Sequence, residues 1–440
     1  MQAELDARTR LRPPERNPAT RTGFGKQKGQ AVLTPKTEEE LAEVIAGTTS
    51  PLHVSGGGTR PVGRVVNGDP LSTAKISGIS IYEPGALTLV ARAGTPLTEI
   101  ETALEKEGQM LAFEPMDHRT LLGTKGTPTV GGVVAGNVSG PRRIQSGACR
   151  DFLLGVRFVD GAGGIIKNGG RVMKNVTGYD LTKLLAGSRG TLGVLTEVSL
   201  KVLPKPDTAA VLLLTGLSDE LAVSAMSAAL GSPYDVSGAA HSPQGLDGGP
   251  VTMVRVEGFE TSVEYRAAQL KELLAQFGPA EIERRSGNDG GQGYEAGWRW
   301  IKDVEAFRDK SSVCRISLKP GASPKIVQAL REKLAFDCLY DWGGGLLWIA
   351  ADHNQLEQIA AEHSGFDDLG KGDRGAAILH SRIQDRVDQA GGHATLVKAS
   401  DAVRNTVSVF QPEAEPLARL AQGLRRQFDP KQILNPGLMD

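Results

Sequence analysis

Apolar residues recur along the chain with two spacings, which predict amphipathic helices and short strands. Leu41, Val44 and Ile45 share one face of a helix, which opens at a capping box formed by Thr37 and Glu40 and continues to Ala46. A second helix is expected from Pro96 to the residue before Gly108. Alternating or continuous apolar runs predict strands at residues 52–54, 87–93, 152–160, 165–166 and 194–202, the third and fourth pairing as a hairpin.

The pattern changes after Pro204 and Pro206, which we interpret as a domain boundary. Strands now alternate with helices, in the rhythm of a small antiparallel sheet backed by helices, close to a ferredoxin-like α+β layer. The sequence shows no clear internal repeat. The strands are expected at residues 251–256, 313–318 and 345–351, the helices at 263–275, 325–334 and 414–428, and loops at 123–140, 287–293 and 366–374.

Composition excludes several classes of protein. The chain has 440 residues, with 50 Lys and Arg against 51 Asp and Glu, so its net charge of -1 disfavours a nucleic-acid partner or an anionic membrane surface. The longest apolar run, residues 209–214, is far too short for a transmembrane segment. Cys149, Cys314 and Cys338 form no disulfide framework or zinc motif, which favours a reducing, cytoplasmic location. Residues 1–30 are expected to form a mobile, polar leader and not a signal peptide.

Glycine is unusually frequent: the chain has 55 glycines among its 440 residues, well above the usual share of about 7%. The copies gather in clusters at residues 56–58, 131–140 and 187–193, each beside an expected strand. Exposed backbone N–H groups in such loops bind phosphate. Neither a strand-to-helix GxGxxG nor a GxxxxGK[ST] motif occurs, which disfavours a Rossmann fold and a P-loop. Tight turns in a β-rich domain are the alternative, but three clusters together favour a nucleotide cradle.

The clusters and their flanks resemble a known family. Residues 54–59, 129–132, 174–181 and 184–194 resemble, in order and spacing, the FAD-binding domain of the vanillyl-alcohol-oxidase/p-cresol-methylhydroxylase (PCMH) superfamily. Residues 140–143, 150–156, 172–175, 391–396 and 428–437 are similar to the FAD-binding accessory subunits of bacterial glycolate oxidases.

The resemblance implies an α+β fold, with a two-lobed PCMH-type FAD-binding domain and a ferredoxin-like α+β cap domain. The implied boundaries are residues 1–30 for the leader, 31–206 for the FAD-binding domain, 207–406 for the cap that meets substrate or partner, and 407–440 for a segment that returns to the FAD-binding domain.

The same resemblance implies which residues bind FAD. Val54, Ser55, Gly56, Gly57, Gly58 and Thr59 match the first pyrophosphate loop. The second loop, along the pyrophosphate and ribityl chain, is matched by Thr129, Val130, Gly131, Gly132, Ala135, Gly136, Asn137 and Gly140. Ser146 and Gly147 fall beside the isoalloxazine ring. The adenine end is matched by Gly190, Thr191, Gly193 and Val194, and Asn435 matches an asparagine that returns to the flavin domain.

Catalytic and covalent features are sparse. His53 and Cys149 are candidates for a covalent flavin link, but a strand histidine and a half-buried thiol explain them better, so we predict non-covalent FAD. The Glu-His-Gly motif and metal-binding histidines of the related dehydrogenases are missing, and no metal is expected. His393 is the candidate base, with a loop histidine as the alternative. We expect Arg189 to contact phosphate or to face solvent. The doublet Arg142–Arg143 is expected to be solvated or ion-paired, with carboxylate binding as the alternative.

The resemblance implies oxidation of a small 2-hydroxy acid such as glycolate to glyoxylate, with the hydroxyl proton going to a base and the Cα hydride to the flavin. Electrons would leave through partners, a second FAD subunit and an iron–sulfur subunit, since this chain lacks iron–sulfur cysteines. Those partners could also hold the chain at the inner membrane. The alternatives are an FAD-containing structural or assembly subunit without turnover, and a stand-alone sugar or aldonolactone oxidase.

Overall fold

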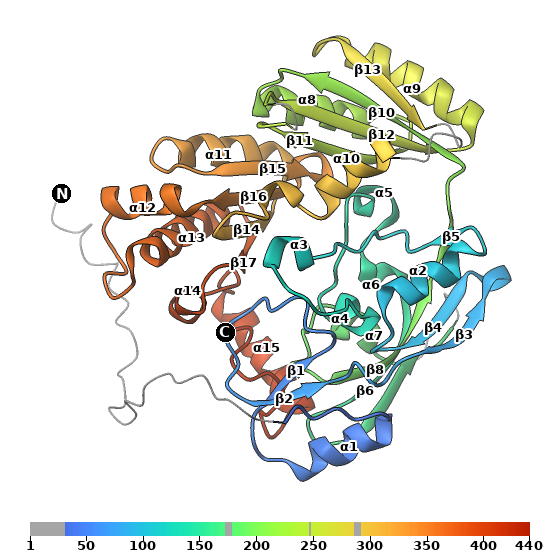
Figure 1. The fold of residues 1–440 in the computed structure, drawn as a ribbon, viewed down its shortest axis with the longest axis vertical. Helices are drawn as coiled ribbons and strands as arrows, with labels where there is room; N and C mark the ends of the chain where they lie inside the picture. Colours follow the sequence, from blue (N-terminus) through green and yellow to red (C-terminus); the bar gives the residue numbers. More distant parts are fainter. Residues whose placement is uncertain (1–30, 172–177, 246–247, 286–291) are drawn as a thin grey trace. The chain divides into compact units, whose positions relative to one another are not determined.

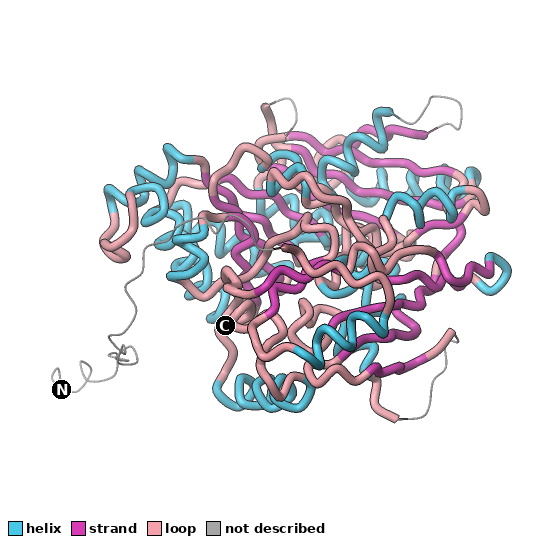
Figure 2. Tube along the Cα trace, turned by 60° about the horizontal axis from the view of Figure 1, so that its bottom comes forward, coloured by secondary structure: helices cyan, strands magenta, loops and turns pink. Residues whose placement is uncertain are grey.

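A computed structural model describes residues 31–171, 178–245, 248–285 and 292–440 (Figure 1). The leader expected at residues 1–30 lies outside the described residues. Residues 32–440 form one unit and contain two large sheets, which can be followed with their helices in Figure 2.

The first sheet has five antiparallel strands in the order β3-β4-β8-β6-β7. Its central strand is β8, whose side chains are buried on both faces except at Glu197 and Lys201. The predicted hairpin is present as β6 and β7. The strands are β3 (Ile79–Glu83), β4 (Thr88–Arg92), β6 (Leu153–Val159), β7 (Ile165–Gly169) and β8 (Val194–Lys201). The helices and turns of this part are α2 (Leu97–Glu105), α3 (Arg119–Leu122), α4 (Val130–Ala135), α5 (Arg143–Ser146), α6 (Cys149–Phe152), α7 (Leu181–Leu185) and η1 (Pro84–Ala86).

A smaller layer is built on the parallel pair β1 (Leu52–Ser55) and β2 (Asp69–Ser72). Helix α1 (Glu38–Gly47) covers it, and its N-cap is the predicted Thr37, whose hydroxyl accepts a hydrogen bond from Glu40 N at 3.1 Å. The chain end returns to the same layer, where Leu434 bridges to Leu52 and both side chains are buried. A pair of two-residue strands, β5 (Gln109–Met110) and β9 (Leu203–Pro204), joins neighbouring loops.

The second sheet has eight antiparallel strands in the order β13-β10-β12-β11-β15-β16-β14-β17. It consists of two βαββαβ units, each with the ferredoxin-like strand order, joined where His241 of β11 pairs with Tyr340 of β15. The first unit contains β10 (Thr208–Thr215), α8 (Asp219–Leu230), β11 (Val236–Ser242), β12 (Val251–Gly258), α9 (Glu260–Leu274) and β13 (Ala280–Arg285). The second contains β14 (Ser312–Ser317), α11 (Ser323–Arg331), β15 (Asp337–Asp341), β16 (Leu346–Ala351), α12 (His353–Glu362), α13 (Lys371–Gln389) and β17 (His393–Lys398).

Strand β16 shows why strands of this sheet have continuous apolar sequences and not alternating ones. Leu347 and Ile349 pack into the core under the helices, whereas Leu346 and Trp348 pack into the core shared with the five-stranded sheet. Successive side chains of a strand point to opposite faces, so both faces of β16 are buried. The helices α8, α9, α11 and α13 therefore cover one face (Figure 1), and the other face is left for the site.

The remaining elements are α10 (Gln292–Lys302), α14 (Asp401–Thr406), α15 (Glu415–Phe428) and the single turns η2 (Glu305–Phe307), η3 (Pro320–Ala322) and η4 (Trp342–Gly344). Among the described residues no helix has both the length and the apolar character needed to cross a membrane.

Two loop predictions are wrong in part. The glycine-rich stretch 123–140 contains α4, because Thr129 caps its N-terminus by accepting a hydrogen bond from Gly132 N. The stretch 366–374 contains the start of α13 at Lys371. Most of the loop predicted at 287–293 lies outside the described residues. The domain boundary near residue 206 stays a prediction, although the two sheets divide between β9 and β10.

Candidate functional site

The three glycine clusters meet around one cavity of about 540 Å³. The cavity lies between the β1 loop, the start of α4, the loop before β8 and the end of the chain. Its volume lies within the range of cofactor sites in proteins. Of the predicted residues, those that line it are Val54, Ser55, Gly56, Gly57, Gly58, Thr59, Thr129, Gly131, Gly132, Ala135, Gly136, Gly190, Gly193, Val194 and Asn435.

The first two glycine loops pack backbone against backbone. A Cβ on Gly57 would overlap the carbonyl oxygen of Thr127, and a Cβ on Gly126 would overlap that of Gly57. Gly58 has φ +70°, a conformation that L side chains rarely adopt, and nothing lies within 4 Å of where its Cβ would be. The loops can therefore approach each other and present bare backbone to the cavity.

The start of α4 brings more backbone to the cavity wall. Gly131 N donates to the carbonyl of Ala93, and a Cβ on Gly131 would lie 2.6 Å from the Ala93 Cβ, so helix and strand end touch closely.

Asn435 joins the first and third glycine clusters. Its Oδ1 accepts a hydrogen bond from Val54 N at 2.7 Å, and its Nδ2 donates to the carbonyl of Arg189 at 2.9 Å. The side chain is 2% exposed, and its φ of +46° suits asparagine better than most residues. The chain end thereby fixes the spacing of two walls of the cavity.

A second, smaller chamber of about 170 Å³ adjoins the cavity. The two share six lining residues: Arg60, Val62, Met116, His118, Gly136 and Arg189. The predicted residues Gly136, Asn137 and Gly140 form one side of the chamber, and strands β14, β16 and β17 of the eight-stranded sheet form the other through Arg315, Trp348 and Thr395. The chamber therefore lies between the turn after α4 and the eight-stranded sheet.

The chamber is strongly cationic. Burial lowers the pKa of Arg60 to about 10. Burial and then the charge of Arg60 lower the pKa of Arg189 to about 9, and burial and then the charges of Arg143 and Arg189 lower that of Arg315 to about 10. All three stay protonated near neutral pH. Burial, and next the charge of Arg60, lower the pKa of His118 well below its ordinary value, so this imidazole is neutral. Its Nδ1 lies 3.3 Å from the Met116 carbonyl, which can only accept, so Nε2 is left as an acceptor.

One carboxyl lines the chamber. Asp341 is 3% exposed, and its Oδ1 accepts a hydrogen bond from Trp342 N at 2.7 Å. Burial raises its pKa to about 7, despite the nearby guanidinium groups of Arg255 and Arg315. Such a group exchanges a proton near neutral pH, which is the property of a general acid or base.

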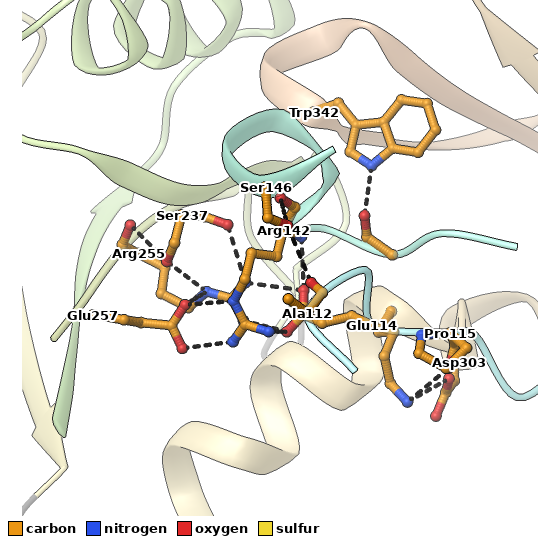
Figure 3. A network of polar contacts seen from close by, with 12 residues as sticks. Ala112, Glu114, Pro115, Arg142, Ser146, Ser237, Arg255, Glu257, Asp303 and Trp342 are labelled. Atoms are coloured by element: carbon orange, nitrogen blue, oxygen red, sulfur yellow. Dashed lines mark hydrogen bonds and ion pairs between the residues drawn. The ribbon is translucent and has the colours of Figure 1, made fainter. Parts of the chain in front are cut away.

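A buried ionic network ties the chamber wall to the eight-stranded sheet (Figure 3). Arg255 of β12 forms a two-point contact with Glu114, at 3.0 Å for each pair of atoms. Arg142 donates to Glu257 of β12 at 2.8 and 3.1 Å, and its Nη1 lies 3.2 Å from Glu114 Oε1. Burial would raise the pKa of both carboxyls, but Arg255 and Arg142 outweigh it, and the pKa of Glu257 falls to about 2. The doublet at 142–143 therefore divides, with Arg142 ion-paired and Arg143 lining the chamber.

Four predicted cofactor residues line neither cavity: Val130, Ser146, Gly147 and Thr191. Ser146 Oγ instead donates to the carbonyls of Ala112 and Arg142 (Figure 3). The candidate base His393 is exposed at the start of β17 and lines neither cavity. These assignments stay predictions. The motif at 172–177 lies outside the described residues.

The two candidates for a covalent link are placed differently. His53 lines the first cavity, and burial lowers its pKa. Cys149 is fully buried and lines neither cavity, and burial raises the pKa of its thiol to about 12. In the described ranges no three His, Cys, Asp or Glu side chains gather closely enough to hold a metal ion.

Sequence reasoning missed Arg60, His118, Arg315 and Asp341, which are single residues without a motif. Doubly buried strands such as β14 and β15 offered one usable signal, because a charged residue inside them has to face a partner or a cavity.

Comparison with known proteins identifies relatives over most of the chain. Residues 29–169 match the FAD binding domain family. Glycolate oxidase subunit GlcE of Escherichia coli (strain K12) is 36% identical over 408 residues, which cover 91% of this chain and 95% of that protein. Glycolate oxidase subunit GlcD of Bacillus subtilis (strain 168) is 32% identical over 189 residues, 42% of this chain and 39% of that protein. A D-lactate dehydrogenase of Anaerostipes hadrus is also 32% identical over 189 residues, 42% of this chain and 38% of that protein.

Solved structures share the fold at low sequence identity. The 4-ethylphenol oxidase from Gulosibacter chungangensis has a TM-score of 0.68 at 12% identity, over 93% of this chain and 88% of that one. An alkyldihydroxyacetonephosphate synthase has a TM-score of 0.62 at 15% identity, over 92% and 76%. The α+β fold with an FAD-binding domain, expected from the resemblance, is confirmed.

Proposed function

Since this chain belongs to the family of glycolate oxidase subunit GlcE and is an FAD-dependent oxidoreductase, we propose that it serves in the oxidation of glycolate or a similarly small 2-hydroxy acid, as one subunit of a complex that carries the electrons away. The observation that supports this most is the contiguity of the glycine-lined cavity with a small cationic chamber.

The residues around the larger cavity fit FAD. Loops without side chains, kept at a fixed spacing by Asn435, can surround a diphosphate with backbone N–H groups. Residues 54–59 and 129–136 are proposed to hold the pyrophosphate and ribityl chain, and residues 190–194 the adenine end. When bound, FAD supplies the acceptor for the hydride of the hydroxy acid.

Residues of this chain orient the hydroxy acid and accept the proton of its hydroxyl group. Two groups at the chamber can accept the hydroxyl proton: the Asp341 carboxylate and His118 Nε2. We favour Asp341 because burial raises its pKa to about 7, whereas the pKa of His118 lies well below its ordinary value. Strands of the eight-stranded sheet cover the chamber with Leu346 and Trp348, which limits the access of water.

Partners are supported by the chain's relatives and by one surface. The relatives GlcE and GlcD are both named as subunits of glycolate oxidase. Helix α15 has no buried residue, and Leu417, Leu420 and Leu424 along it are 59%, 66% and 40% exposed. A row of exposed leucines on one helix is typical of an interface. We propose that it faces a companion subunit, with a second flavin subunit and an iron–sulfur subunit as the companions, in the cytoplasm or attached to the inner membrane through them.

Non-covalent attachment of the flavin belongs to this proposal. Cys149 is fully buried and lines neither cavity, and among the described residues no carboxylate contacts His53 to activate it. Acid precipitation of the yellow protein is expected to leave the flavin in the supernatant. Colour that stays in the pellet, and is lost in a His53→Ala variant, would contradict this.

The test of the function is anaerobic reduction by glycolate, first with the FAD-loaded chain alone and then with the complex isolated through a tag on this chain. The proposal expects flavin bleaching in the complex and companions that include an iron–sulfur protein. Bleaching of companion flavin only, unchanged by Asp341→Asn, would favour an assembly subunit without turnover. Rapid reoxidation of the lone chain by air, with a sugar acid as the better reductant, would favour a stand-alone oxidase.

A further inference from the structure

Two arginines in the chamber share one aromatic support. The guanidinium of Arg143, from α5, lies 4.5 Å from the centre of the Trp342 ring, and that of Arg315, from β14, lies 5.0 Å from it. Trp342 is itself fixed, because its Nε1 donates to the Gly140 carbonyl at 3.0 Å and its backbone N donates to Asp341. Stacking on Trp342 therefore holds the guanidinium groups of Arg143 and Arg315 in place without a carboxylate of the protein as their partner.

The arginines of the chamber are not matched by ion pairs in the described part of the chain. Arg60, Arg143, Arg189 and Arg315 form no ion pair there, and Lys302 pairs with Asp303. Asp341 is the one carboxyl in the lining, and burial works against its ionisation. Like charges at close range repel strongly inside a protein, and Arg143 lowers the pKa of Arg315. An anion placed between these groups would relieve that repulsion.

The four arginines divide by position. Arg60 and Arg189 line both cavities and stand where a cofactor phosphate or a substrate could meet them. Arg143 and Arg315 line the small chamber and are absent from the lining of the large cavity. Their anion is therefore expected to be separate from the cofactor. At about 170 Å³ the chamber is less than a third of the volume of the large cavity, which suits an acid of two to four carbons.

We propose that Arg143 and Arg315, supported on Trp342, form a carboxylate-binding subsite that holds the acid group of the substrate. The planar guanidinium groups suit a carboxylate, which accepts paired hydrogen bonds. With the carboxylate there, the substrate's hydroxyl carbon remains inside the chamber, which Asp341 and His118 also line. This subsite rests on the proposed function for the identity of the acid, but its anion preference can be tested without turnover.

The experiment measures binding of oxalate, a dicarboxylate that cannot be oxidised as a hydroxy acid, to the FAD-loaded chain by calorimetry and by the change in the flavin spectrum. Ethylene glycol serves as the uncharged probe. The variants are Arg315→Gln, Arg143→Gln and the charge-conserving Arg315→Lys. Arg382→Gln, on the exposed side of α13, is the matched control for loss of one positive charge. FAD affinity of the flavin-stripped chain is measured for each variant.

The proposal expects wild type to bind oxalate and not ethylene glycol. Arg315→Gln and Arg143→Gln should weaken oxalate binding roughly tenfold to a hundredfold, and Arg315→Lys by less. Arg382→Gln should stay within about twofold of wild type, a change of under about 0.4 kcal/mol by the equilibrium relation. FAD affinity should change little in all of them. Should Arg315→Gln fail to fold, Arg143→Gln and Arg315→Lys carry the test.

Unchanged oxalate affinity in the glutamine variants, or no binding by wild type, overturns the subsite. A loss of FAD affinity that equals the loss of oxalate affinity also overturns it, since the arginines would then serve the cofactor. Oxalate binding that depends on Arg315, without reduction of the complex by glycolate, keeps the subsite and contradicts the proposed function. Reduction of the complex by glycolate, with oxalate binding that does not depend on Arg315, supports the proposed function and overturns the subsite.

Discussion

The amide side chain of Asn435 and the backbone of Val54 are joined by a 2.7 Å hydrogen bond across 381 residues of chain. Replacement by alanine should leave Val54 N and the Arg189 carbonyl without their buried partner and strain a position with φ +46°. We expect Asn435→Ala to lower the free energy of unfolding by about 2–3 kcal/mol and FAD affinity by roughly tenfold. Chemical denaturation and flavin titration measure the two effects.

Asn435→Gly separates the two causes in that prediction, because glycine tolerates the positive φ but makes no side-chain hydrogen bond. Its FAD affinity should fall as far as that of the alanine variant, with a smaller loss of stability. Two variants that bind FAD like wild type would show that the chain end does not support the cofactor cavity.

The contact of the first two glycine loops predicts a sharp response at Gly57. A methyl group there would overlap the Thr127 carbonyl oxygen, so the loops must separate. Gly57→Ala should therefore abolish detectable FAD binding, whereas Gly85→Ala, with nothing within 4 Å of its Cβ, should bind FAD normally. Fluorescence titration of the stripped protein measures both. Wild-type affinity in Gly57→Ala would place the cofactor elsewhere.

The ionic network between the sheets predicts a pH-dependent contribution from Glu257. Its pKa in the folded chain is about 2, against 4.5 ordinarily, so its stabilisation is complete above pH 4.5 and is lost as the pH falls towards 2. Glu257→Gln should lower the free energy of unfolding by about 3 kcal/mol at pH 7, and the deficit should shrink between pH 4.5 and 2. The exposed Glu413→Gln is the control. A deficit that does not vary with pH would refute the charge argument.

Asp341 should contribute to the pH dependence of stability with the opposite sign from Glu257. Its pKa of about 7 in the folded chain exceeds the ordinary 3.8, so the folded state favours the protonated form and loses stability as the pH rises from about 4 to 7. Asp341→Asn keeps the acceptor for Trp342 N but stays neutral. The variant should gain roughly 2–4 kcal/mol over wild type between pH 4 and pH 8, measured by denaturation.

The same substitution should affect turnover in the complex. If Asp341 takes the hydroxyl proton, Asp341→Asn lowers the rate of flavin reduction at least about 100-fold and removes the pH dependence near 7. A His118→Gln variant should retain that pH dependence. If instead His118→Gln removes it and Asp341→Asn retains it, the roles of the two residues are exchanged.

Helices and strands could be predicted from the sequence where neighbouring residues alone determine them. The helix over 37–46 was predictable because Thr37, Glu40 and the apolar face of Leu41 and Ile45 agree within ten residues. The strand 194–202 was predictable for the same reason. The glycine clusters could be recognised from the sequence without any long-range contact, since the first follows β1 and the third precedes β8, and their contact with the cofactor stays a prediction.

The rest depends on contacts between distant parts of the chain. The junction of two βαββαβ units rests on the pairing of β11 with β15, about 100 residues apart, and the two units share no pattern visible in the sequence. The chamber gathers Arg60, Arg315 and Asp341 from three separate segments, so no motif could reveal it. The short helix α4 was hidden by glycines that ordinarily disfavour helix.

The central claim, that bare backbone loops surround the diphosphate of FAD, is tested most directly by an experimental structure of the FAD-loaded protein. The account predicts pyrophosphate oxygens within hydrogen-bond distance of N–H groups in residues 56–59, and a flavin ring that reaches towards the chamber of Arg143 and Arg315. A flavin bound outside this cavity, with the loops turned away from its phosphates, would contradict it.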